Sequence, residues 1–289
     1  ATALARLHDR LDRAYAGRPH AIAADRAFAE AVAHHAIPRA LPEALLDGFL
    51  WDAEMRRYPD LATLHGYAAR VAGTVGLMMA LLMGSHDPHV LARACDLGVA
   101  MQLTNIARDV GEDALAGRLY LPLDWLAAVG VDPDAFLAAP RFTPALGTVI
   151  AALLAEADRL YRRAEAGIAR LPASCRAGIG AARLIYAEIG REVERHGGNS
   201  VDRRAVVPTR RKLALLAASA ARTASWSTAR LDDEPLPATR FLVEAALAVP
   251  RHGRSRNDLD SRIAWLVGLY DRLERRDRTG RLAMARVVR

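Results

Sequence analysis

Cysteine is scarce in this chain of 289 residues, and the way it is placed argues against two kinds of protein. The two cysteines, Cys95 and Cys175, stand alone in apolar stretches and form no CxxC motif. A disulfide framework and a cysteine zinc site both need more cysteines at defined spacings. We therefore interpret both residues as reduced core cysteines of a cytosolic protein.

Long hydrophobic runs are missing as well. The longest apolar stretch, Val71–Met83, is too short to cross a bilayer, which takes about 20 residues. The first residues form a charged amphipathic pattern without the apolar centre of a signal peptide. Strand-like alternation of Val, Ile and Thr is rare, and there is no GxGxxG nucleotide motif or regular repeat.

Lysine is nearly absent, because Lys212 is the only one in the chain. Arginine therefore carries almost all of the positive charge, and the net charge is +7. The planar guanidinium fork suits phosphate oxygens. Such a balance admits diphosphate substrates, anionic lipid surfaces or nucleic acid as partners, and codon bias would explain it equally well. Composition alone does not decide among these explanations.

Helix-forming residues fill most of the chain, which is 52% hydrophobic and 25% charged. Apolar periodicity, interrupted at Gly and Pro, predicts an all-α protein in a single domain, 1–289. A loop containing LPLDWL is expected between the fifth and sixth helices. The expected helices are 3–15, 24–36, 42–57, 60–83, 88–114, 144–170, 173–196, 208–226, 238–247 and 257–275.

The stretch from Gly98 to Leu121 carries the strongest chemical signal. On a helix, the side chains of Gln102, Asn105, Asp109 and Asp113 form one column, because they are three, four and four residues apart. Amide and carboxylate oxygens are ligands that suit Mg²⁺. A solvated acidic helix face is the alternative. The apolar remainder of this helix and the flanking Arg108 and Arg118 favour a metal and diphosphate site.

A second stretch, Tyr67 to Gly84, places Gly73, Gly76 and Ala80 on one face of an apolar helix. Small residues at this spacing allow two helices to pack closely, which is their commoner role. The alternative is a tunnel for a hydrocarbon chain. The residues that would line the tunnel are Leu77, Met78, Met79 and Met83.

A third stretch runs from Tyr186 to Lys212 and contains two arginine pairs, Arg203-Arg204 and Arg210-Arg211, after a Gly-Gly break. A solvated basic loop is the default interpretation. A clamp for phosphate groups is the functional alternative.

Together these stretches resemble the squalene/phytoene synthase family, and most closely its bacterial phytoene synthases. NIARDVGED followed by AGRLYLPLDWL resembles the second aspartate-rich motif, and RVAGTVGLMM resembles the helix that lines the substrate cavity. HAIPRALPEALLDGFLWDAEMRRY, SCRAGIGAARLIYAEIG and SVDRRAVVPTRRKLALL resemble other parts of the family. The resemblance extends from about Leu4 to Ser219. It implies one helical bundle around an apolar cavity, with two aspartate-rich motifs facing each other across it.

The resemblance also implies roles for individual residues. Asn105, Asp109 and Asp113 correspond to Mg²⁺ ligands, with Gln102 beside them. The family's diphosphate-binding or polar cavity residues correspond to Arg108, Arg118, Tyr120, Tyr186 and Arg204. Its cavity wall corresponds to Tyr67, Val71, Gly73, Gly76 and Gly98. Asp109, Asp113, Arg108, Tyr67 and Tyr186 are the residues that we expect to act in catalysis.

The chain departs from the family pattern in two places. The first aspartate-rich motif, a DxxxD on an early helix, is not present, and Asp47 and Asp52 stand at the wrong place for it. We expect this motif upstream, in a segment of about sixty or seventy residues before Ala1. Where the family usually has a second tyrosine after Tyr67, this chain has Ala69, so the cavity is expected to be wider there.

The implied reaction joins two geranylgeranyl diphosphates head to head, through a cyclopropyl diphosphate, to phytoene. It implies Mg²⁺, or Mn²⁺ in its place, and no nicotinamide cofactor. The expected location is the cytoplasm, with peripheral contact at the inner face of the cell membrane because the product is insoluble in water. No nucleic acid or obligate protein partner is expected.

Other functions fit parts of the same pattern. A squalene or hydroxysqualene synthase would use the same chemistry on farnesyl diphosphate, and the sequence does not fix the depth of the cavity. A non-catalytic, membrane-associated relative would explain the missing first motif, although the intact column of Asn105, Asp109 and Asp113 argues against it. A helical nucleic-acid binder ranks last, because the chain has no recognition motif.

Overall fold

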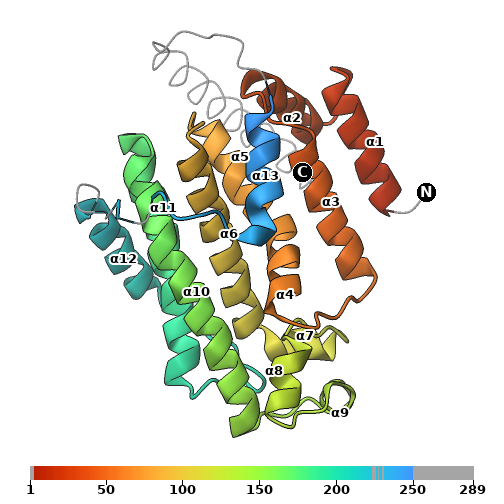
Figure 1. Cartoon of the computed structure of the whole chain (residues 1–289), viewed down its shortest axis with the longest axis vertical. Helices are drawn as coiled ribbons and strands as arrows, with labels where there is room; N and C mark the ends of the chain where they lie inside the picture. The colour runs from red at the N-terminus through yellow and green to blue at the C-terminus, as the bar shows by residue number, and fades with distance from the viewer. Residues whose placement is uncertain (1–2, 223–225, 227, 230, 250–289) are drawn as a thin grey trace, which may run out of the picture. The chain divides into compact units, whose positions relative to one another are not determined.

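The computed structural model describes residues 3–222, 226, 228–229 and 231–249 (Figure 1). Every regular element in these residues is a helix, which confirms the all-α prediction for this part of the chain. The helices are α1 (Ala3–Tyr15), α2 (Ala23–His34), α3 (Ala40–Ala53), α4 (Leu61–Ala68), η1 (Ala69–Gly73), α5 (Thr74–Leu82), α6 (Pro88–Arg108), α7 (Val110–Leu115), α8 (Leu123–Ala128), α9 (Pro133–Ala138), α10 (Pro144–Arg170), α11 (Ala173–Arg195), α12 (Thr209–Ala221), η2 (Pro237–Thr239) and α13 (Arg240–Leu247).

Two of the predicted helices are subdivided in the structure. The helix expected at 60–83 contains a π-helical turn, η1, between α4 and α5. The helix expected at 88–114 bends at Asp109, which separates α6 from α7. The expected loop around LPLDWL instead contains two short helices, α8 and α9, and the expected helix 257–275 lies outside the described residues.

Local sequence explains where several helices begin. The carboxylate of Asp87 accepts a hydrogen bond from the backbone N–H of His89, and Pro88 supplies the first helical position of α6. Asp60 and Thr63 form a capping box that starts α4. Thr143 caps α10, which again begins with a proline. These caps satisfy backbone N–H groups that would otherwise lack partners.

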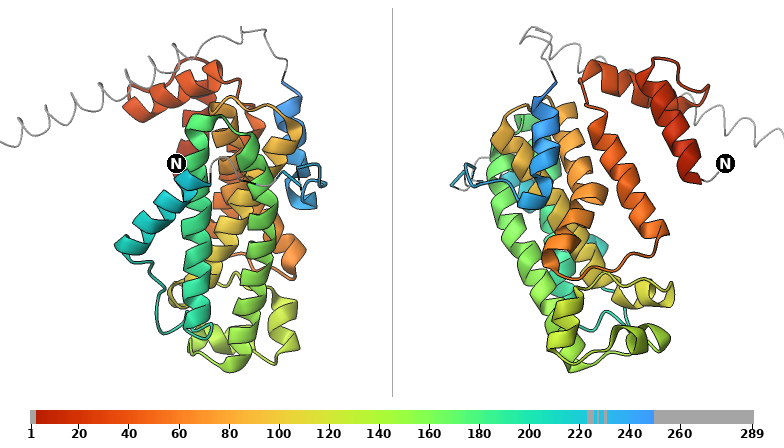
Figure 2. Two further views of the ribbon diagram at one scale, coloured as in Figure 1. Left: turned by 90° about the vertical axis from the view of Figure 1, so that its left-hand side faces the viewer. Right: turned by 45° about the vertical axis from the view of Figure 1, so that its right-hand side comes forward.

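Helix α6 lies at the centre of the bundle and packs against α5, α10 and α11. Figures 1 and 2 show these helices side by side, with α7, α8, α9 and the connection 196–208 gathered at one end. Leu91 and Leu103 of α6 are completely buried. Burying one leucine side chain contributes about 1.5–3 kcal/mol, so the apolar faces of these long helices account for much of the stability.

A buried ion network fastens a connecting segment to α6 and α10. The carboxylate of Asp96 lies 2.8 Å from Nε of Arg93 and accepts a hydrogen bond from Nε of Arg163 at 3.0 Å. Arg93 and Asp96 are both 0% exposed. The same arginines also donate to the carbonyl oxygens of Asp233 and Glu234. The segment before α13 is therefore held by charged groups inside the bundle.

The described residues belong to one compact unit, Ala1–Val249. Within them, no helix combines the length and the hydrophobicity that a membrane crossing requires.

Candidate active site

A cavity of about 320 Å³ lies among α5, α6, α10 and α11. Its wall is mostly apolar, and the polar side chains in it are those of Arg93, Gln102, Asn105 and Tyr186. Val75 and Met79 also line the cavity and are 42% and 43% exposed, so it reaches solvent along α5. A concave apolar site with a few polar groups is typical of a site for a small, largely hydrophobic ligand.

Two glycines in the cavity wall bring α6 into close contact with α5 and with the π-helical turn η1 before it. A Cβ atom on Gly76 would lie 2.3 Å from the carbonyl oxygen of Ala94, and one on Gly98 would lie 2.2 Å from that of Ala72. No larger residue fits at these positions without a shift of the backbone. Close packing is therefore one role of these glycines, and both also line the cavity, as does Val71.

Gly73 and Tyr67, also predicted as wall residues, do not line this cavity. Leu242 of α13 occupies the space beside Gly73, since a Cβ atom there would lie 3.6 Å from the Leu242 methyl group. Tyr67 instead points towards a cluster of tyrosines. Half of the expected tunnel residues line the cavity, and the other half pack in the core: Met79 and Met83 are in the first group, Leu77 and Met78 in the second.

The predicted polar column continues across the bend at the end of α6. The backbone N–H of Asp109 donates to the carbonyl of Asn105 at 2.9 Å, and that of Asp113 donates to the carbonyl of Asp109 at 2.8 Å. The four-residue spacing is therefore kept from α6 into α7. Gln102 and Asn105 line the cavity, so the column continues from the cavity wall.

Asp109 is held by two arginines. Arg108 donates from Nε and Nη2 to the two carboxylate oxygens, and Arg204 donates from Nε to Oδ1 at 2.8 Å. Burial alone would raise the pKa of Asp109, but these hydrogen bonds outweigh burial and lower its pKa. Arg204 comes from the segment 196–208, which is distant in sequence and lies in the stretch for which a phosphate clamp was the alternative to a solvated basic loop.

Asp113 has the opposite environment. Its carboxylate forms no hydrogen bond or ion pair with any described residue. Burial, followed by the negative charge of Asp109, raises the pKa of Asp113 to about 6. Arg118 lies nearby and its backbone N–H donates to the carbonyl of Asp113, but its positive charge only partly offsets these effects.

The donors in this column fit a hard divalent cation. The amide oxygen of Asn105 is buried without a hydrogen-bond partner among the described residues. Two carboxylates follow it at four-residue spacing, and burial together with the charge of Asp109 raises the pKa of the second one. Amide and carboxylate oxygens suit Mg²⁺ or Mn²⁺. Within the described chain, no cluster of three or more His, Cys, Asp or Glu residues would bind a metal, so the amide is needed to complete a set of three.

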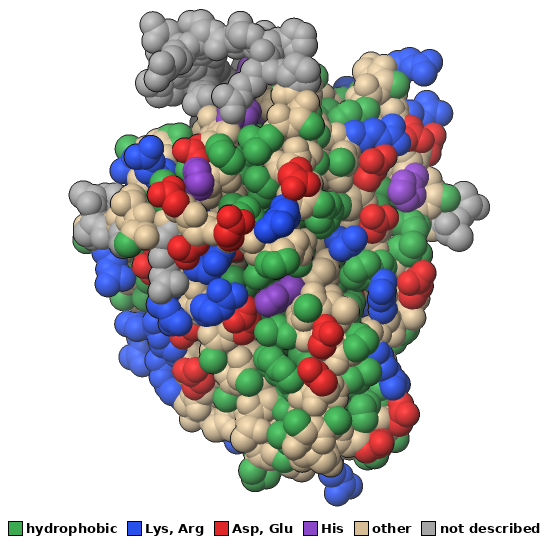
Figure 3. Space-filling view, in the orientation of Figure 1, with side chains coloured by type: hydrophobic (Ala, Val, Ile, Leu, Met, Phe, Trp, Pro, Cys, Tyr) green, Lys and Arg blue, Asp and Glu red, His purple; other side chains and the backbone are tan. Residues whose placement is uncertain are grey.

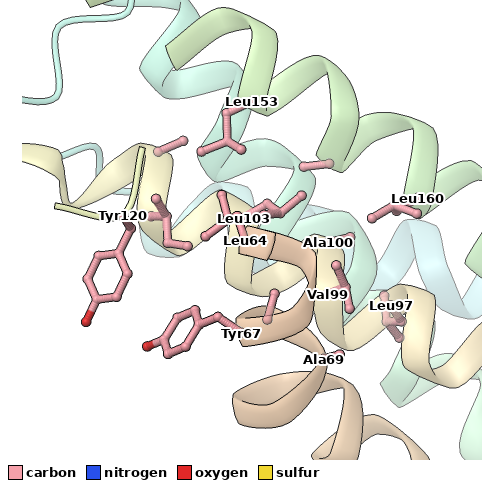
Figure 4. Close-up of a cluster of buried hydrophobic side chains, with 14 of the residues drawn as sticks. Leu64, Tyr67, Ala69, Leu97, Val99, Ala100, Leu103, Tyr120, Leu153 and Leu160 are labelled. Atoms are coloured by element: carbon pink, nitrogen blue, oxygen red, sulfur yellow. The ribbon is translucent and has the colours of Figure 1, made fainter. Parts of the chain in front are cut away.

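Three tyrosines form a stacked cluster beside this column. The hydroxyl groups of Tyr67 and Tyr120 both donate to Oδ1 of Asp52, at 2.8 and 2.7 Å. Figure 4 shows these two hydroxyls on the side away from the buried leucines. The ring of Tyr58 lies 5.3 Å from Tyr67 and 6.1 Å from Tyr120. Burial and the hydrogen bond to Asp52 raise the pKa of Tyr120 to about 12, so the phenols stay protonated at neutral pH.

The family model described as squalene/phytoene synthase matches residues 1–212. The chain belongs to the squalene/phytoene synthase family. The phytoene synthase of Cereibacter sphaeroides is 50% identical to it over 277 residues, which cover 94% of this chain and 76% of that relative. The phytoene synthase of Rhodobacter capsulatus is 51% identical over 250 residues, covering 85% of this chain and 74% of that one.

The solved structures contain a similar fold. A dehydrosqualene synthase crystallised with a ligand superposes with a TM-score of 0.69 and 28% identity, over 77% of this chain and 78% of that chain. The family assignment and the isoprenoid-synthase type of helical bundle are therefore confirmed. The roles of the individual site residues in this family member stay predictions.

One residue of the site region was missed by the sequence analysis. Asp52 was considered only for the first aspartate-rich motif, for which its position is wrong, yet it joins Tyr67 to Tyr120. The three residues are far apart in the sequence, and no spacing rule connects them. The signal available in the sequence was an acidic residue that follows the apolar run 49–51 near the end of a helix.

Proposed function

We infer that this chain joins two geranylgeranyl diphosphates head to head, through a cyclopropyl diphosphate, to form phytoene in carotenoid biosynthesis. The observation that carries this inference is the 50% identity to a phytoene synthase over 94% of the chain. The apolar cavity, which borders a column of amides and carboxylates, suits a substrate with a long hydrocarbon chain and a diphosphate group. The chain is therefore a prenyltransferase-type enzyme.

The residues of this chain would contribute to the reaction by stabilising charge. Both steps release diphosphate from carbon, so negative charge grows on the leaving oxygen. Arg108, Arg118 and Arg204 lie beside the column and offer N–H donors to that group. The apolar wall keeps water from the carbocation, and the ring of Tyr186 in the wall offers it a π face.

The residues that would hold Mg²⁺, with Mn²⁺ as an alternative, are Asn105, Asp109 and Asp113. The bound cation would supply positive charge that stabilises the departing diphosphate. The condensation to phytoene transfers no hydride, so the proposal includes no nicotinamide cofactor.

Product analysis tests the proposal. The protein is incubated with labelled geranylgeranyl or farnesyl diphosphate, with Mg²⁺ and with a chelator, and the hydrocarbons are extracted. We expect phytoene from the longer substrate with Mg²⁺ only. Asp109→Asn should lower turnover by at least about 100-fold, because a charged ligand in the site is lost, while the surface variant Asp134→Asn should keep full activity.

A second candidate function is condensation of farnesyl diphosphate, favoured by the structural similarity to a dehydrosqualene synthase. The same experiment separates the two, because a preference for farnesyl diphosphate would move the chain to that branch. No hydrocarbon from either substrate, in a folded protein, would contradict both and favour a non-catalytic role.

We also propose that the protein works in the cytoplasm and contacts the inner face of the cell membrane through α12. Leu215 and Ser219 face the bundle, and the Ser219 hydroxyl donates to the carbonyl of Ala177 on α11. On the outside, Leu213 is 62% exposed and Leu216 is 48% exposed. This helix therefore presents leucines to solvent while its other side is firmly packed.

The charges around these leucines match an anionic lipid surface. Arg210 and Lys212 are exposed and form no ion pair with any described residue, and α12 contains no acidic side chain. Figure 3 shows basic side chains gathered at the edge of the molecule where Figure 1 places α12. Apolar residues flanked by Lys and Arg are typical of helices that lie on membranes.

Vesicle flotation tests this contact. We expect the protein to float with vesicles that contain phosphatidylglycerol and not with phosphatidylcholine vesicles. Leu213→Glu should abolish flotation, whereas the control Ile22→Glu, at a residue that is 50% exposed just before α2, should not. Equal loss in both variants, or binding that ignores lipid charge, would contradict the assignment of α12.

A further inference from the structure

The three oxygen donors of the column are not equally available. Both carboxylate oxygens of Asp109 accept hydrogen bonds from arginine, whereas the carboxylate of Asp113 and the amide oxygen of Asn105 accept none from the described residues. Oδ1 of Asp109 already accepts two of these hydrogen bonds and Oδ2 accepts one, so a cation that binds all three donors meets an Asp109 carboxylate that is largely occupied and faces two guanidinium charges. The arginines therefore compete with the metal for the same oxygens.

The backbone fixes Arg204 in this position. The N–H of Gly111, two residues after Asp109, donates to the carbonyl of Ser200 at 3.1 Å. A Cβ atom on Gly111 would lie 2.1 Å from the carbonyl oxygen of Val201, so only glycine allows the two segments to come this close. The segment 196–208 is therefore docked on α7, and Arg204 reaches Asp109 as a consequence of that docking.

The displaced arginines would need a new anion. Arg108 is only 18% exposed, so moving it away from Asp109 without another partner would leave a half-buried charge uncompensated. A diphosphate provides several oxygens that accept from a guanidinium fork. Exchange of Asp109 for diphosphate keeps the arginines paired and frees the carboxylate at the same time.

We propose that Arg108 and Arg204 keep Asp109 closed to a divalent cation until a diphosphate arrives, and then transfer their hydrogen bonds to the diphosphate. This proposal rests on the function inferred above. Cation and diphosphate then bind cooperatively, because each removes the same obstacle for the other. Such coupling is reciprocal, so the factor by which diphosphate tightens cation binding equals the factor by which the cation tightens diphosphate binding.

Arg204→Gln is the variant that separates this coupling from simple charge loss. Arg204 is 48% exposed, so the change should leave the fold intact, and Arg108 remains on Asp109. Its neighbour Arg203 is exposed and forms no ion pair with a described residue, so Arg203→Gln removes the same charge from the same segment. Arg204→Lys keeps the charge and loses the fork.

Two binding measurements test the proposal without turnover. Mn²⁺ binding, followed by the electron paramagnetic resonance signal of the free ion, should be weak in the unaltered protein and about 5-fold or more tighter in Arg204→Gln. Equilibrium dialysis of labelled inorganic pyrophosphate, at fixed free Mn²⁺, should show weaker binding in the same variant. Arg203→Gln should match the unaltered protein in both, and Arg204→Lys should fall between.

Equal Mn²⁺ affinity in Arg204→Gln and the unaltered protein would overturn the proposal, as would an equal effect of Arg203→Gln. Neither result depends on product formation. A protein that makes phytoene without this coupling would retain the proposed function and refute the exchange. A protein that shows the coupling and makes no hydrocarbon would refute the proposed function alone.

Discussion

Asp109 and Asp113 show how strongly the surroundings of a residue set its chemistry. The two carboxylates stand one helical turn apart, yet the pKa of one is lowered by arginines and the pKa of the other is raised to about 6 by burial and by its neighbour. Spacing in the sequence predicted that these residues share a face. Both arginines pair with Asp109, and one of them, Arg204, comes from a distant segment. Hydrophobic periodicity does not predict this contact.

The raised pKa of Asp113 has a direct consequence for stability. A carboxyl group whose pKa rises on folding stabilises the folded state below its ordinary pKa of 3.8, and this contribution is lost as the pH rises through about 6. Without metal at pH 8, Asp113→Asn should therefore raise the free energy of unfolding by about 1 kcal/mol, after allowance for solvent screening. Urea unfolding at several pH values measures the effect.

The difference between Asp113→Asn and the unaltered protein should shrink as the pH falls from about 6 towards 4, because the carboxyl group becomes protonated in the folded state. Asp109→Asn is the matched control and should destabilise at pH 8, because its carboxylate pairs with two arginines. A destabilised Asp113→Asn at pH 8 would show that burial does not dominate at this position.

At the level of elements, the sequence predicted most of the long helices and missed how they are interrupted. Apolar periodicity continues through 60–83, so nothing in it marks the π-helical turn at Ala69–Gly73. The helices α8 and α9 are each six residues long, too short for a periodic signal. Their prolines were taken as loop residues, whereas Pro133 occupies the first position of α9 and Pro122 stands just before α8.

The contact between η1 and α6 depends on glycine, and a matched pair of variants tests it. Gly98→Ala would place a methyl group 2.2 Å from the Ala72 carbonyl oxygen, a backbone atom that moves only with its helix. The cost should be about 1–3 kcal/mol. Gly178→Ala on α11 meets no atom within 4 Å and should be neutral or stabilise by up to about 1 kcal/mol. Chemical denaturation compares the two, and equal effects would contradict the close-packing role.

Across the described unit, the buried ions around Asp96 tie together parts that hydrophobic patterning leaves separate. Asp96 is 0% exposed and lies between Arg93 and Arg163. These arginines also donate to the carbonyl oxygens of Leu231, Asp233 and Glu234. When a charged residue stands in the middle of an apolar helix, the sequence does not show which distant residues pair with it. The network therefore belongs to the part of the fold that only the structure shows.

Asp96→Asn should lower the free energy of unfolding by about 3–5 kcal/mol, because two buried guanidinium groups would lose their counter-charge. The control is Asp134→Asn, which breaks the pair between Arg57 and Asp134 on the surface, where Asp134 is 79% exposed. It should cost less than about 1 kcal/mol. Urea unfolding curves distinguish the two, and a loss below 1 kcal/mol for Asp96→Asn would mean that the network contributes little.

The exposed position of Lys212 gives the protein a natural chemical handle. Because the chain contains a single lysine, a reagent that modifies side-chain amines attaches one dye at a known site on α12. A dye whose emission depends on polarity would then report, without any engineered cysteine, how deeply this helix enters a lipid surface. Endoproteinase Lys-C, which cuts after lysine, has one cleavage site in the whole chain, so protection of that bond by vesicles would reveal the same contact on a gel.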